Sequence, residues 1–132
     1  MFNTAALIIA LLIGVEGADI AQTVLADQPT IVKTTPTLGA KINPGPFLLS
    51  ATFDSPMMDG SFSLVQVSKS TYPDCKGRPE RSSDGRTFTL RCTASAGRRY
   101  EVWFNRPPFT NFKSIRGAPA KPIRLTFAVL GR

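Results

Sequence analysis

The segment from residue 34 to 57 (TTPTLGAKINPGPFLLSATFDSPM) constrains the fold more than any other part of the chain. It contains an extended run, residues 47–53, between two turn-forming stretches, NPGP at 43–46 and DSP at 54–56. Within the run the side chains alternate with the period of two that a β-strand requires. One face carries Phe47, Leu49, Ala51 and Phe53, and we expect that face to be buried.

Short alternating runs recur along the rest of the chain, separated by Gly, Pro or Asp-Gly. Further strands are predicted near 30–35, 62–67, 86–92, 99–104 and 123–129, and Asp84-Gly85 predicts a hairpin turn. Two of these strands have clear inward sets, namely Tyr100, Val102 and Phe104 in one and Ile123, Leu125, Phe127 and Val129 in the other. About seven strands over residues 30–132 predict an all-β, immunoglobulin-like sandwich.

The order of these pieces resembles a known family. The 34–57 segment is followed by DGSFSLV, DGRTFTL, AGRRYEVWFN, NFKS and GAPAKP, and together they resemble the bacterial Ig-like domain of the SbsA type over residues 29–129. This resemblance implies a β-sandwich that serves as an accessory module of cell-surface and exported proteins, without a catalytic site. It also implies that Tyr100 is a corner residue whose hydroxyl returns to the backbone.

The first residues predict export. Residues 5–15 (AALIIALLIGV) form an uncharged apolar run, too short to span a bilayer and typical of a signal peptide. We assign residues 1–17 to the signal peptide and 18–29 to a linker. Cleavage after Ala26 also fits the small-residue pattern, and an uncleaved anchor is an alternative because residues 1–4 lack Lys and Arg. A periplasmic or secreted protein without a stable membrane span after processing is predicted.

The two cysteines, Cys75 and Cys92, are the only ones in the chain. An even count in an oxidising compartment predicts a disulfide bond between them. Closing this loop is expected to contribute on the order of 3 kcal/mol. In a reducing compartment they would instead be two buried thiols.

The charge distribution bears on partners. The formal net charge is +7. From Lys76 onward the chain has thirteen Lys or Arg residues and only three acidic ones, Glu80, Asp84 and Glu101. Outside the cytosol this excess favours an anionic envelope polymer or lipid headgroups, although a solvated basic face is the simpler interpretation. No dense basic run with interleaved aromatics is present, so nucleic acid is not predicted as a partner.

The absence of histidine from the whole chain removes the commonest general base and metal ligand. We therefore predict no catalytic residue, no metal site and no cofactor. Periplasmic copper carriers share a similar sandwich and a proline-rich opening, and Met57-Met58 is the only segment that suggests Cu(I). Adjacent residues of an extended segment point to opposite sides, so this pair cannot complete a site, and a copper carrier is kept as a remote alternative.

The candidate binding surface lies around Trp103. If Tyr100 and Phe104 point inward, then Arg99 and Trp103 point outward, close to Arg106. This surface is predicted to bind an envelope protein or an anionic polymer. It consists of Arg99, Trp103, Arg106, Phe109 and Phe112. Two alternatives remain: residues 105–122 fold back with their two phenylalanines and cover the indole, or an exposed edge strand pairs with a partner in assembly.

Overall fold

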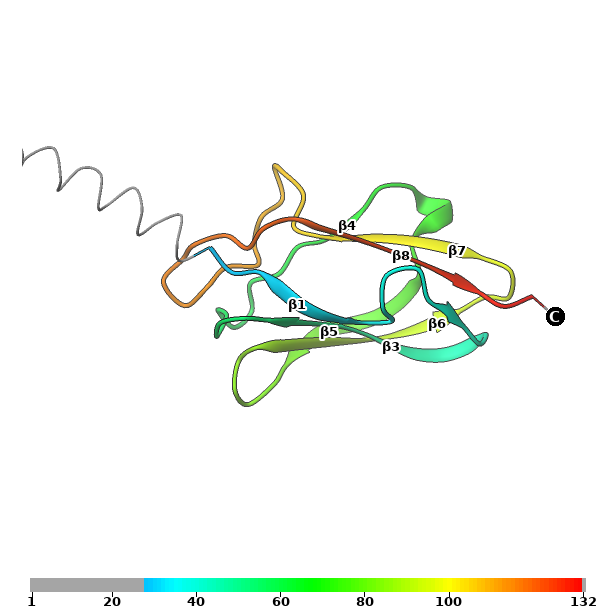
Figure 1. Cartoon of the computed structure of the whole chain (residues 1–132), viewed down its shortest axis with the longest axis horizontal. Helices are drawn as coiled ribbons and strands as arrows, with labels where there is room; N and C mark the ends of the chain where they lie inside the picture. The colour runs from blue at the N-terminus through cyan, green and yellow to red at the C-terminus, as the bar shows by residue number, and fades with distance from the viewer. Residues whose placement is uncertain (1–27, 132) are drawn as a thin grey trace, which may run out of the picture.

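The computed structural model describes residues 28–131 as two four-stranded β-sheets packed face to face. The first sheet has the order β1-β3-β6-β5, formed by Ile31–Thr35, Gly45–Phe53, Thr87–Ala94 and Asp74–Arg81. The second has the order β2-β8-β7-β4, formed by Lys41–Ile42, Ile123–Val129, Arg99–Phe104 and Leu64–Gln66. Figure 1 shows the two layers nearly edge-on, and the predicted β-sandwich is confirmed.

All strand pairs in the described region are antiparallel except β2 with β8, where Lys41 and Ile42 pair with Ala128 and Val129. The predicted hairpin at Asp84-Gly85 joins β5 to β6. Strands β2 and β5 were not predicted from the sequence. In β5 (DCKGRPER) the alternation is broken, because pairing with β6 shifts between Lys76 and Glu80 around Gly77.

The core between the sheets is built from the predicted inward positions. Leu49, Ala51 and Phe53 of β3 meet Val102 and Phe104 of β7, and β6 and β8 contribute the other main apolar faces. Phe112 is completely buried among four aromatic rings, those of Phe53, Phe62, Phe88 and Phe104. The long connection between β7 and β8 therefore inserts a phenylalanine between the two layers.

Asn105 fixes that connection. This side chain is fully buried, its Nδ2 donates to the carbonyl oxygens of Phe112 and Ala120, and its Oδ1 accepts from the Phe112 N–H, all at 3.0 Å. Because three loop groups depend on one buried amide, the residues on either side of it are held in fixed positions.

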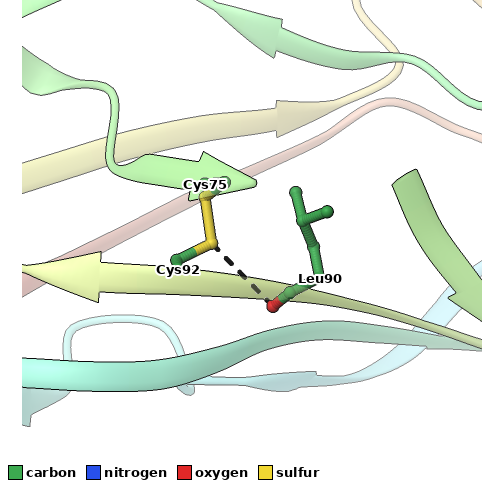
Figure 2. The surroundings of a disulfide bond; sticks show 3 residues. All are labelled: Cys75, Leu90 and Cys92. Carbon is green, nitrogen blue, oxygen red and sulfur yellow. Dashed lines mark hydrogen bonds between the residues drawn. A yellow bond between two sulfur atoms is a disulfide. The ribbon is translucent and has the colours of Figure 1, made fainter. Parts of the chain in front are cut away.

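The disulfide between Cys75 and Cys92 is present. The two cysteines are direct cross-strand partners, with Cα atoms 3.9 Å apart, and Figure 2 shows the bond running from one strand to its neighbour. The Sγ of Cys92 also lies 3.8 Å from the Leu90 carbonyl oxygen. The bond therefore joins the edge strand β5 to the inner strand β6 just before their pairing becomes irregular.

Tyr100 has the role that the family resemblance implies. Its hydroxyl accepts a hydrogen bond from the backbone N–H of Ser95 at 3.0 Å, while its ring packs on Phe127. This contact ties the turn between β6 and β7 to the core.

The predicted signal peptide, residues 1–17, and the cleavage positions at Gly17 and Ala26 lie outside the described residues. Within residues 28–131, no helix is long and apolar enough to cross a membrane.

Candidate functional site

Strand β7 presents the residues that the sequence singled out. Tyr100, Val102 and Phe104 are buried, whereas Arg99 is exposed and Trp103 is half-buried. The predicted alternation is confirmed, and the arginine and the indole lie on the outer surface of the second sheet.

A connected set of side chains holds Trp103 in place. Its Nε1 donates to Oε2 of Glu101 at 3.1 Å, and Nε of Arg124 donates to the same oxygen at 2.7 Å. The guanidinium carbon of Arg106 lies 5.3 Å from the centroid of the Trp103 ring, within the range of a cation–π contact. The set contains two guanidinium groups and one carboxylate, so it keeps an excess of positive charge.

The electrostatics of Glu101 reflect this set. The hydrogen bond from Arg124 is the largest cause that holds the pKa of Glu101 below its ordinary value, with a smaller contribution from Trp103. Glu101 therefore stays ionised at neutral pH and orients both donors.

A hollow of about 350 Å³ adjoins this set. Lys41, Arg99, Glu101, Arg124 and Thr126 are among its lining residues. Lys41 and Arg99 both pair with Ala128, from opposite sides of β8, so two distant parts of the chain bring their cations to one row. Within residues 28–131, neither side chain makes a hydrogen bond or an ion pair.

These residues form one surface, which we call the Trp103 face: Lys41, Arg99, Glu101, Trp103, Arg106 and Arg124. Arg99 and Trp103 are four residues apart on a strand, a distance of about 13 Å, and Arg106 lies over the ring at the far end. The cations are thus distributed along the sheet rather than gathered at one point.

One predicted member of the surface needs correction. Phe112 was predicted as a binding residue, but it is fully buried in the core, because Asn105 draws its backbone inward. Phe109 is 59% exposed, and its reciprocal backbone hydrogen bonds with Arg106 close a tight turn through Pro107 and Pro108, so its binding role stays a prediction. The alternative in which both phenylalanines cover the indole is therefore wrong, and the group that lies over the ring is the Arg106 guanidinium.

Sequence reasoning missed three members of the Trp103 face as site residues. Arg124 and Glu101 could have been found, because each occupies an outward position in a strand whose inward set was predicted. Lys41 could not, because β2 has only two residues and joins the sheet by parallel pairing with the last strand.

The donor set does not suit a transition metal. Met57 is completely buried, whereas Met58 is 39% exposed, so the two thioethers do point to opposite sides. Both cysteines are in the disulfide, and residues 28–131 contain no group of three or more His, Cys, Asp or Glu side chains that could hold a metal ion.

Comparisons with known proteins support the fold alone. No protein-family model and no curated protein matches the chain. Among solved structures, CopC from Methylosinus trichosporium OB3b aligns with a TM-score of 0.57 and 18% sequence identity, covering 80% of this chain and 96% of that chain. At this identity the likeness shows a shared β-sandwich and does not transfer a function.

Proposed function

We propose that the chain is a non-catalytic, exported Ig-like module that binds an anionic polymer of the cell envelope through the Trp103 face. The observation that carries this proposal is the pair Lys41 and Arg99, two cations without partners in the described region, beside a rigidly held indole and two further arginines.

An extended polyanion suits the distribution of charge. Cations spaced over about 13 Å match successive charged groups of a polymer better than one compact ion. The single carboxylate on the face, Glu101, is already neutralised by Arg124, so it opposes an approaching anion only weakly. Arg106 is exposed and its guanidinium lies over the Trp103 ring, so it can bind a planar anionic group of the ligand.

Salt-dependent retention on immobilised heparin, a sulfated glycan, tests the proposal. The wild-type chain is expected to be retained and to elute with added salt, because surface charge pairs are screened within about 8–10 Å at physiological ionic strength. The double variant Arg99→Glu with Arg106→Glu is expected to elute at much lower salt.

A matched control separates the face from net charge. Lys76→Glu with Arg91→Glu makes the same change in charge on exposed residues of β5 and β6, in the first sheet rather than the sheet that carries Trp103. Equal losses in the two double variants, or retention of wild type that does not depend on salt, would contradict the proposal.

The likeness to CopC favours a second candidate, the copper carrier considered from the sequence. The donors argue against it, because the chain has no histidine and Met57 is buried. Titration of the full chain with Cu(I) and Cu(II) against a chromophoric competitor checks this. We expect no copper retained per chain, and stoichiometric binding lost in Met57→Leu with Met58→Leu would reverse the ranking.

Assembly through an edge strand has weaker support. The four edges are β1, β5, β2 and β4, of which β2 and β4 have two and three residues. Strand β5 is charged and interrupted by Gly77 and Pro79, and β1 shifts register between Ile31 and Lys33. Short, charged and bulged edges are the features that discourage strand addition.

A further inference from the structure

The outer surface of the first sheet carries a second cationic feature that the Trp103 face does not explain. Leu48, Arg91 and Lys76 are direct neighbours across β3, β6 and β5, and all three are exposed. We call this row the Leu48 face. It lies on the opposite side of the sandwich from Trp103, since the inner surfaces of the two sheets meet at the core.

Lys76 and Arg91 are an unfavourable pair in the fold itself. Like charges directly opposite one another on neighbouring strands destabilise a sheet. Within residues 28–131, neither side chain makes a hydrogen bond or an ion pair that would offset this repulsion. The neighbouring arginines of β5 are engaged elsewhere, Arg78 over the ring of Phe62 and Arg81 with the carbonyl oxygen of Met57.

The disulfide holds this pair together. Cys75 directly precedes Lys76 and Cys92 directly follows Arg91, so the bond fixes the adjacent row of the two strands. Beyond Lys76 the pairing of β5 with β6 lapses until Glu80. Without the disulfide, the two cations would lie beside the interruption in pairing, where β5 can separate most easily from β6.

The surroundings select a compact anion. Hollows of about 470 Å³ and 370 Å³ adjoin the row and share Leu48, Lys76 and Arg91 in their linings. Asp74 and Glu80 flank the row on β5, so a long polyanion laid across this surface would meet carboxylates on both sides. Two cations together balance a phosphate monoester, which carries a charge of about −1.5 to −2 near pH 7.

We propose that Lys76 and Arg91 form a disulfide-clamped site for a phosphate monoester, with the exposed Leu48 contacting an apolar group attached to it. Arg supplies a planar fork and Lys a point charge, the two modes by which proteins hold phosphate. The same chemistry is available from a soluble phosphomonoester and from the headgroup of phosphatidic acid, and the experiment distinguishes these sources.

The first arm titrates the isotope-labelled full chain with inorganic phosphate and follows backbone amide shifts. Saturable shifts are expected around Lys76 and Arg91. They should be lost in Lys76→Gln with Arg91→Gln and kept in the matched variant Arg99→Gln with Arg106→Gln on the other face. Affinity should fall as the pH is lowered from about 7.5 to about 5, because phosphate takes up a proton over this range and loses one of its two negative charges.

The second arm measures cosedimentation with phosphatidylcholine vesicles with and without phosphatidic acid. Comparing variants of the same full chain cancels any binding by residues 1–27. Preference for phosphatidic acid that falls in Lys76→Gln with Arg91→Gln and in Leu48→Ser identifies the lipid source. Phosphate binding without that preference identifies a soluble ligand, and both results support the site.

The third arm tests the clamp with Cys75→Ser and Cys92→Ser together, at a temperature where circular dichroism shows that the variant is folded. Binding about tenfold weaker than wild type is expected. Unchanged binding in this folded variant overturns the clamp. No saturable shift with phosphate and no preference for phosphatidic acid, or effects that persist without Lys76 and Arg91, overturn the site, while heparin retention by the Trp103 face is unaffected by either failure.

Discussion

The two outer faces of the sandwich use basic residues in different ways. On the Trp103 face, Arg124 and Arg106 are engaged with Glu101 and the indole, and Lys41 and Arg99 extend the charge along the sheet. On the Leu48 face, two cations that have no partner among residues 28–131 stand side by side in a single row, with carboxylates on the rows around them. An extended surface suits a polymer and a compact pair suits one phosphate, so net charge alone does not describe what this protein can bind.

The faces also differ in what supports them. On the Trp103 face, Arg106 is carried by the loop after β7, which is anchored by Asn105 and Phe112, whereas the Leu48 face depends on the disulfide between β5 and β6. Substitutions in the loop anchor or in the disulfide should therefore affect the two faces unequally.

Removal of the buried ring tests the loop anchor. Phe112→Ala is expected to lower the free energy of unfolding by about 3–5 kcal/mol, because it leaves a cavity among four aromatic rings. Phe109→Ala, at an exposed position in the same loop, should change it by less than about 0.5 kcal/mol. Denaturant titration of both variants is the measurement, and similar losses would mean that Phe112 is not the anchor.

Removal of the disulfide sharpens the comparison between the faces. Cys75→Ser with Cys92→Ser is expected to cost on the order of 3 kcal/mol of unfolding free energy. Heparin retention should be unchanged where the variant is folded, because the bond lies in the other sheet. A parallel loss of retention would show that the two faces are not independent.

Neutralising Glu101 should have the smallest effect. Glu101→Gln removes the carboxylate from the Trp103 face, so the salt concentration for elution from heparin should rise modestly. A fall in that concentration would mean that the placement of Trp103 and Arg124 by Glu101 matters more than its charge.

The pH dependence gives a second measure of Glu101. Its pKa lies below the ordinary value of about 4.3. Its stabilising contribution is therefore present above that value and is lost as the pH falls through the lower, folded-state pKa. The difference in stability between wild type and Glu101→Gln should shrink in this acidic range, as thermal melts at stepped pH would show, and a difference that stays constant would rule out the linkage.

Regular alternation allowed a strand and its buried face to be predicted together, whereas β2 and β5, which lack it, were not predicted. Residues 47–53 and 123–129 have inward sets that identify both the strand and its buried face. Strand β5 could not be predicted in this way, because Gly77 and Pro79 interrupt its alternation. Pairing with β6 and the disulfide hold it in the sheet.

The candidate site shows the same limit. Alternation correctly predicted that Arg99 and Trp103 point outward, because successive side chains of a strand point to opposite faces of the sheet. The burial of Phe112 could not be predicted, because it depends on three hydrogen bonds from one asparagine across a loop. The arrival of Lys41 beside Arg99 depends on long-range pairing through β8, which no local pattern encodes.

The most direct test of the central claim follows the single indole N–H of the chain by nuclear magnetic resonance. On titration with a short heparin oligosaccharide, the account predicts saturable shifts of the Trp103 indole and of amides at Arg99 and Arg124, with little change at Lys76 and Arg91. Shifts confined to the Leu48 face, or small shifts spread over every basic residue, would contradict it.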